Sequence, residues 1–263
     1  MPRQEFSTSL AAVLTMTGAA IGLGNIWRFP YMMGSYGGSA FLLVYLLFVL
    51  LIAIPALTGE WALGRHARGG TISAFAACYG ARGGRVLGYV FVIAMLCSGS
   101  YYLVVIGNVA YMTWTSFVTG FAGEHHQQFL DGLEHGPTRY LLALAVLLGI
   151  LWVAYRGLHD GIERVSKLFV PFFFVVIIYL IVQTFRLEGA PGKMLEFLTP
   201  DFTQLTTTSV FAALGQAVFS VGLGGTIMVI YGSYLSRGSS LWRGAFATAG
   251  ADTAAAMLAA LFI

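Results

Sequence analysis

The sequence predicts an all-α integral membrane protein with about seven transmembrane helices, and three observations support this fold class. Of its 263 residues, 58% are hydrophobic and only 10% are charged, whereas about a quarter of the residues of a soluble domain are charged. Uncharged runs long enough to cross a bilayer, which takes roughly 20 apolar residues, recur along the chain. The segments between these runs differ in charge in an alternating order, as expected when successive loops lie on opposite sides of a membrane.

The apolar runs define the expected spans. In chain order, these lie near residues 8–34, 38–62, 86–118, 138–155, 165–185, 205–235 and 243–263. The fourth span is short for a helix that crosses the bilayer. The seventh is still hydrophobic where the sequence ends.

The charges between the spans predict the orientation. Arginine and lysine gather in residues 63–85, 156–167 and 236–243. The 119–137 segment carries three acidic residues and no lysine or arginine. Because lysine and arginine favour the cytoplasmic side, we expect a multi-pass protein of the inner (plasma) membrane with a cytoplasmic N-terminus. The net charge of +3 then comes from arginines in the cytoplasmic loops. Because this explains the positive charge, no nucleic-acid partner is expected.

Three histidines leave one alternative open. His125, His126 and His135 lie near Glu124 and Asp131, a group that could hold a metal ion. We favour the simpler interpretation, in which these are solvated polar residues of an outer loop.

Two of the predicted spans contain paired glycines near their centres. IGLGN at 21–25 has a counterpart in VGLGG at 221–225, in the first and sixth spans. Each glycine weakens a helix by about 1 kcal/mol relative to alanine, and unwound backbone in a membrane is tolerated only where it lines a cavity or is buried in protein. Paired interruptions of this kind indicate an inverted-repeat transporter. Free N–H groups would hold an anion and free carbonyls a cation, so we expect a site for a zwitterion and sodium. The alternative for the Gly18–Gly22 pair is ordinary helix packing.

Four motifs resemble those of the neurotransmitter:sodium symporters, in particular the bacterial amino-acid branch of the LeuT type. They are GLGNIWRFPY, GGSAFLLVYLL, IPALTGEWALGR and FSVGLGG, and the resemblance covers the whole chain. It implies a partial inverted-repeat transporter with spans 1 and 6 broken at mid-membrane. Residues 1–263 would form a single transmembrane domain, with the first five-helix repeat in 1–185 and the start of a second in 186–263. Since the family has eleven or twelve spans, the resemblance implies a truncated sequence or a short gene product.

The resemblance implies transport and no enzymatic activity. The expected function is sodium-coupled symport of a neutral, hydrophobic amino acid by alternating access, independent of chloride. The partners are then the amino acid, sodium ions and the lipid bilayer, and a homodimer is also allowed. Rocking one repeat against the other requires both repeats, so we expect the 263-residue chain alone not to transport. The alternative is a membrane fragment without transport activity, or a regulatory membrane protein.

Two sodium sites follow from the resemblance. The first would use the Ala20 carbonyl, the Asn25 side-chain oxygen, the hydroxyl and carbonyl of Ser220, and Asp252. The second would use the carbonyls of Gly18 and Ile21, and its other ligands belong to an eighth span. Oxygen donors of this kind suit a hard cation.

The resemblance also implies the substrate contacts. The carboxylate would meet the N–H groups of Leu23 and Gly24, the Tyr102 hydroxyl and the first sodium ion. The amino group would meet the carbonyls of Ala20, Phe219 and Ser220, and Phe219 would close the pocket. Monoamine carriers have an aspartate where this chain has Gly22, so the substrate here must bring its own carboxylate. A hydrophobic side chain would fit beside Val218, Gly222 and Gly225.

Four further residues resemble gating or structural positions of the family. Arg28 resembles the outer-gate arginine and Arg3 the inner-gate arginine, although the acidic partners of both lie outside this sequence. Glu60 resembles the glutamate that braces the broken helices through their free N–H groups. The alternatives are a snorkelling charge for Arg28 and a simple boundary charge for Glu60.

The chloride site of the family maps onto Tyr45, Gln216, Ser220 and Ala256. Ala256 offers neither a hydroxyl nor a charge there. Asp252 stands where many relatives carry asparagine, and a carboxylate in the membrane costs roughly 2.5–3.5 kcal/mol on insertion scales. We therefore expect Asp252 to serve both as sodium ligand and as the negative charge that replaces chloride. The alternative is a packing or boundary acid near the end of the sequence.

Overall fold

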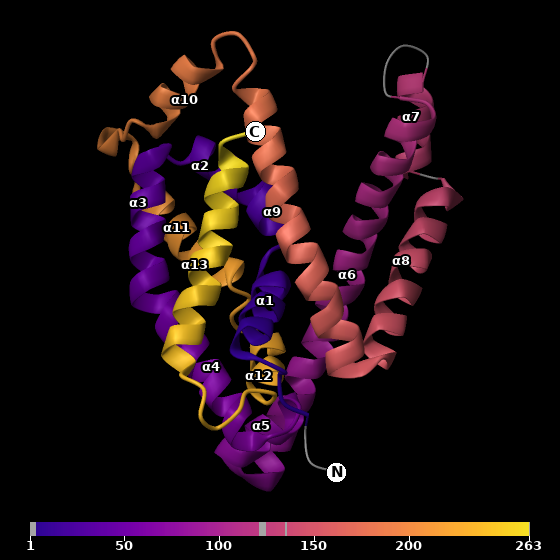
Figure 1. The fold of residues 1–263 in the computed structure, drawn as a ribbon, viewed down its shortest axis with the longest axis vertical. Coiled ribbons are helices and arrows are strands. Elements are labelled where there is room, and N and C mark those ends of the chain that lie inside the picture. Colours follow the sequence, from indigo (N-terminus) through magenta and orange to yellow (C-terminus); the bar gives the residue numbers. More distant parts are fainter. Residues whose placement is uncertain (1–3, 121–124, 135, 263) are drawn as a thin grey trace. The chain divides into compact units, whose positions relative to one another are not determined.

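The computed structural model describes residues 4–120, 125–134 and 136–262, and within these residues every regular element is a helix (Figure 1). The chain divides into two compact units. The first comprises Met1–Gly88 with Glu163–Ile263, and the second comprises Tyr89–Ile162. Both broken spans belong to the first unit.

The first span is a broken helix. α1 (Ser9–Ala20) begins at Thr8, whose hydroxyl accepts the Ala11 N–H, and ends where Ile21 turns to an extended conformation. A π-helical segment, Gly24–Arg28, resumes the path and continues into α2 (Phe29–Ser35). The two halves are bent by 60°. The Gly22 N–H donates to Oδ1 of Asn25 at 3.1 Å, so the chain turns here without a helical hydrogen bond.

The sixth predicted span is interrupted as well. α11 (Thr207–Ser220) begins with a capping box formed by Thr206 and Ser209, and α12 (Ile227–Gly232) follows after six non-helical residues. Gly222 and Gly224 have φ of 71° and 77°, and Thr226 has φ of 58°. Only glycine adopts such angles without steric cost, so the glycine pair makes this interruption feasible.

The remaining elements of the first unit are mostly long helices. α3 (Ser39–Phe48) and α4 (Ile54–Ala67) are joined through a π-helical segment, and the predicted 63–85 loop contains α5 (Thr71–Tyr79). α6 (Arg85–Val118) starts in this unit and continues into the second. The other helices are α9 (Arg164–Thr184), α10 (Ala190–Leu198) and α13 (Leu241–Ala260).

The second unit contains the rest of α6 together with α7 (His125–Glu134) and α8 (Pro137–Tyr155). α6 and α8 pack closely where a Cβ on Gly107 would lie 3.0 Å from the Ala143 Cβ. Tyr111 on α6 stacks on Phe129 of α7, with ring centroids 6.0 Å apart. The 119–137 segment, predicted as a loop, is therefore partly helical.

By length and composition, four helical stretches of the described residues can cross a membrane, or five if the bent first span counts as one. The four are Ser39–Ala67, Thr71–Val118, Pro137–Tyr155 and Leu158–Thr184. α11 has 14 residues and α12 has 6, so neither half of the sixth span reaches that length alone. The count of seven spans remains a prediction.

The core of the first unit depends on close contacts between backbones. A Cβ on Gly64 of α4 would lie 1.9 Å from the Val229 carbonyl oxygen of α12, and a Cβ on Gly232 would lie 2.7 Å from the Cα of Trp61. α13 packs against α1, α4 and the π-helical segment after the first break, and Figure 1 shows it beside α1. This packing brings the centre of α13 to the breaks in the first and sixth spans.

Candidate functional site

Three polar side chains meet where the two broken spans approach α13. Nδ2 of Asn25 donates to Oδ1 of Asp252 at 2.8 Å, to the Asp252 carbonyl at 3.1 Å, and to Oγ of Ser220 at 3.3 Å. The Ser220 hydroxyl donates to Oδ2 of Asp252 at 2.5 Å. The cluster therefore joins residues that are 195 and 227 positions apart in the sequence.

This cluster is buried, and in the described part of the chain no positively charged side chain pairs with it. Asn25 and Asp252 are fully buried and Ser220 is 3% exposed. Among the described residues, the carboxylate of Asp252 has neutral donors but no ion pair. A buried charge without a counterion is costly, so a bound cation would stabilise this arrangement.

The donor set fits a hard cation such as sodium. A carboxylate, a hydroxyl and a side-chain amide offer oxygen atoms, which such cations prefer. Asn25, however, turns its Nδ2 toward Asp252 and its Oδ1 toward the Gly22 N–H. A half-turn of the amide exchanges these two atoms, and the predicted contact between its oxygen and sodium requires that rotation.

The first break leaves backbone groups without helical partners. The carbonyls of Gly18, Ala20 and Ile21 would normally accept from the N–H groups four residues later. The Gly22 N–H bonds instead to the Asn25 side chain, and the Asn25 N–H bonds to the Gly22 carbonyl at 3.1 Å. No hydrogen bond of the Leu23 or Gly24 N–H is found within the described residues. Donors and acceptors are thus available on both sides of the break.

Phe219, Gly24 and Arg28 lie together beside this break. The guanidinium carbon of Arg28 is 4.6 Å from the centroid of the Phe219 ring, a cation–π contact. A Cβ on Gly24 would lie 2.7 Å from Cε1 of the same ring. Phe219 is 53% exposed, so its ring forms an accessible wall next to the free N–H groups.

Glu60 on α4 contacts the second break. Its Oε1 accepts a hydrogen bond from the Gly224 N–H at 2.8 Å. Its Oε2 is buried and has no hydrogen-bond partner among the described residues.

The second break contains predicted substrate residues, and one of them, Gly222, has open space beside it. A Cβ on Gly222 would meet only the Met228 methyl, at 3.7 Å. Gly225 lies in the same interruption, and Val218 lies on α11 just before it.

Tyr45, Gln216 and Ala256, which the resemblance maps onto the family's chloride site, are all buried in the first unit. The Tyr45 hydroxyl is 3.4 Å from the Thr253 hydroxyl. Both amide atoms of Gln216 are buried without a hydrogen-bond partner in the described part of the chain, and Ala256 is fully buried. Sequence reasoning missed Thr253, although its position next to Asp252 was a signal that could have been used.

Other predicted residues belong to the second unit or lie outside the described residues. Tyr102 lies on α6 within the second unit and is 43% exposed. Arg3, Glu124 and His135 lie outside the described residues. Among the side chains that the structure describes, no three His, Cys, Asp or Glu residues are grouped so as to hold a metal ion.

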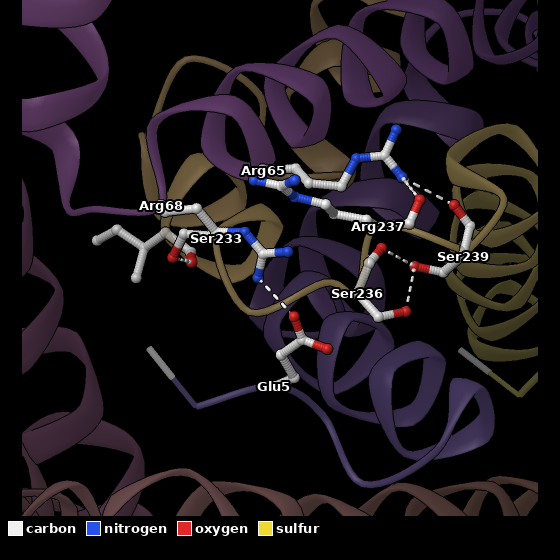
Figure 2. A network of polar contacts seen from close by, with 8 residues as sticks. Glu5, Arg65, Arg68, Ser233, Ser236, Arg237 and Ser239 are labelled. Atoms are coloured by element: carbon white, nitrogen blue, oxygen red, sulfur yellow. Dashed lines mark hydrogen bonds and ion pairs between the residues drawn. The ribbon is translucent and has the colours of Figure 1, made fainter. Parts of the chain in front are cut away.

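A second polar network holds the loop before α13 (Figure 2). Nη1 of Arg65 donates to the Ser239 carbonyl at 2.8 Å and lies 3.5 Å from the Arg237 carbonyl. Arg68 pairs with Glu5 at 2.9 Å. Sequence reasoning treated these arginines only as loop charges. Arg65 in fact ties α4 to the loop that leads into α13, the helix that carries Asp252.

Two broken helices that meet at a buried acid–amide–hydroxyl cluster are the features expected of an inverted-repeat membrane transporter. The model of the sodium:neurotransmitter symporter family matches residues 3–130 and 121–263, so the chain belongs to this family. It is 33% identical over 245 residues to the uncharacterized sodium-dependent transporter YhdH of Bacillus subtilis, covering 92% of this chain and 54% of that protein.

Other relatives agree with this assignment. The Drosophila melanogaster sodium-dependent serotonin transporter is 28% identical over 303 residues, covering 99% of this chain and 48% of that protein. The crystal structure of MhsT in complex with L-phenylalanine matches with a TM-score of 0.85 and 33% identity, over 99% of this chain and 60% of that chain. The chain thus spans about half to three-fifths of the length of these relatives.

Proposed function

We propose that the protein is a sodium-coupled symporter of a neutral, hydrophobic α-amino acid, working by alternating access in the plasma membrane with its N-terminus in the cytoplasm. The observation that carries this proposal is the fully buried carboxylate of Asp252, which accepts from Asn25 and Ser220 and has no positive partner among the residues that the structure describes. Sodium would supply the missing charge and share the oxygen atoms of the cluster.

The sodium ion would be held by the oxygens of Asn25, Ser220 and Asp252 together with the Ala20 carbonyl. The carbonyls of Gly18 and Ile21 would form part of a second sodium site. Both carbonyls lack the donors that they would have in a continuous helix. Support for sodium as the coupling ion comes from the family, whose relatives include sodium-dependent transporters.

The amino acid would lie between the two breaks. Its carboxylate would accept from the N–H groups of Leu23 and Gly24, and Gly22 leaves it the space that an acidic side chain would occupy. Its amino group would meet the carbonyls of Ala20, Phe219 and Ser220. The Phe219 ring, with Arg28 above it, would close the pocket over the bound substrate. MhsT, the structural relative, was crystallised with L-phenylalanine, which supports a substrate with a hydrophobic side chain.

Coupling would follow from the shared position of ion and substrate. If the substrate carboxylate contacts the first sodium ion, each binds more tightly when the other is present, because the coupling free energy is reciprocal. Asp252 would also make the carrier independent of chloride, since its negative charge would replace that of the chloride ion whose family site maps onto Tyr45 and Gln216.

Uptake by the full-length protein in proteoliposomes tests the proposal. We expect labelled phenylalanine or leucine to accumulate under an inward sodium gradient and not when choline replaces sodium. Unlabelled neutral amino acids should compete, and dopamine, which has no carboxylate, should not. Uptake that is indifferent to sodium, or a preference for dopamine, would contradict the proposal.

A further inference from the structure

One buried hydroxyl of α13 has no hydrogen-bond partner. Thr248 is fully buried, and its Oγ1 bonds to no group within the described residues. A buried threonine in a helix usually bonds to a carbonyl of the preceding turn or to a neighbour. An orphaned polar atom in a native core often marks an ordered water molecule.

Thr248 lies midway between the cluster around Asp252 and a pocket. It is four residues before Asp252 and four residues after Gly244, so the three residues share one face of α13. Each step corresponds to a rise of about 6 Å. One water molecule with two hydrogen bonds of ~2.8 Å spans such a step between a hydroxyl and a carboxylate.

The pocket lies at the start of α13. It has a volume of about 390 Å³ and is lined by Gly244 and Ser240 at that end of α13, by Met16 of α1, and by Trp61 of α4. The indole N–H of Trp61 also has no partner within the described residues. The pocket borders the 236–243 loop, which the arginine pattern assigns to the cytoplasmic side.

We propose that Thr248 binds a water molecule that forms the middle step of a water path from this pocket to the first sodium site. The inference rests on the proposed function for the sodium site itself. Water reaching Asp252 along α13 would replace the protein oxygens around sodium as the ion leaves toward the cytoplasm. A path of neutral water is compatible with the positive charge of Arg243, which is one of the residues that line the pocket.

Sodium kinetics on the purified full-length protein test this path. Thr248→Val removes the hydroxyl at nearly constant volume, and Thr248→Ser keeps it. Thr15→Val is the matched control, because Thr15 is another buried threonine without a hydrogen-bond partner among the described residues and is not one of the residues that line the pocket. Sodium release is followed by tryptophan fluorescence after dilution into choline buffer.

We expect Thr248→Val to slow both sodium release and sodium binding about tenfold, which corresponds to a barrier higher by ~1.36 kcal/mol, with the dissociation constant unchanged. Thr248→Ser and Thr15→Val should behave like the unmutated protein. A high-resolution structure of the full-length protein should show water on the Thr248 hydroxyl. Unchanged rates in Thr248→Val, an equal slowing in Thr15→Val, or a hydroxyl bonded to the Gly244 carbonyl would overturn the path. Absence of any sodium binding by the unmutated protein would instead contradict the proposed function.

Discussion

The Ser220 hydroxyl donates to Oδ2 of Asp252 at 2.5 Å and so connects the last residue of α11 to the centre of α13. The contact lies where the sixth span stops being helical. A cation bound at Asp252 would therefore act on the end of the broken helix. The hydrogen bond therefore links the binding of an ion at Asp252 to the position of the chain where the sixth span is interrupted.

Replacing Ser220 tests this link. Ser220→Ala leaves a buried carboxylate oxygen without its donor, which costs about 1–3 kcal/mol, and also removes a proposed sodium ligand. We expect the sodium concentration needed for half-maximal amino-acid binding to rise about tenfold or more. Ser220→Thr keeps the hydroxyl and should have a much smaller effect. Equal behaviour of the two variants would show that the hydroxyl has no role in sodium binding.

Asp252 should make transport independent of chloride. Uptake by the full-length protein should be the same when gluconate replaces chloride. Asp252→Asn should weaken uptake, and the double change Asp252→Asn with Ala256→Ser should recover part of it only when chloride is present. The measurement is amino-acid uptake by the unmutated protein, the single variant and the double variant, each in chloride and in gluconate. Strict chloride dependence of the unmutated protein would rule out this role.

Gly24 should be required for substrate binding rather than for stability. A Cβ at this position would lie 2.7 Å from the Phe219 ring, which can rotate away, so Gly24→Ala should displace the pocket wall. We expect a loss of amino-acid affinity of about tenfold, or ~1.4 kcal/mol, with little change in melting temperature. Gly34→Ala is the control on the same half-span, because a Cβ there meets nothing within 4 Å. Similar affinities for the two variants would contradict the proposed pocket.

Gly64 should be required for stability. A Cβ there would lie 1.9 Å from the Val229 carbonyl oxygen, and this contact is relieved only if α4 and α12 move apart. Overpacking of this kind typically costs about 1–3 kcal/mol. Gly64→Ala should therefore lower the melting temperature in detergent. Gly59→Ala on the same helix should not, since a Cβ there has no neighbour within 4 Å.

Local features of the sequence predicted much of the fold. Glycine lowers helix propensity wherever it occurs, so the paired glycines at 21–25 and 221–225 marked the two interruptions. The family resemblance made Asp252 a candidate sodium ligand, and the cost of a carboxylate in an apolar run supported a functional role for it. The resemblance to the neurotransmitter:sodium symporters came from the four sequence motifs.

Contacts between distant residues could not be read from a single sequence. Nothing in the sequence separated Arg65 from the other loop arginines. The hydrogen bond of Arg65 to the Ser239 carbonyl, in the loop before α13, joins residues 174 positions apart. Glu60 was expected to brace both broken helices, but among the described residues its carboxylate accepts a hydrogen bond only from the Gly224 N–H. The helices within the 63–85 and 119–137 segments, and α10 between the fifth and sixth predicted spans, were also missed, because charge patterns indicate topology and not local helix formation.

The central claim is that sodium at Asp252 and an amino acid at the two breaks bind as a coupled pair. Equilibrium binding of labelled L-phenylalanine to the purified full-length protein, measured across sodium concentrations, tests it most directly. The affinity should increase with sodium, should not increase with potassium or choline, and should lose its sodium dependence in Asp252→Ala. Binding of equal affinity without sodium, or an unchanged sodium dependence in Asp252→Ala, would contradict the account.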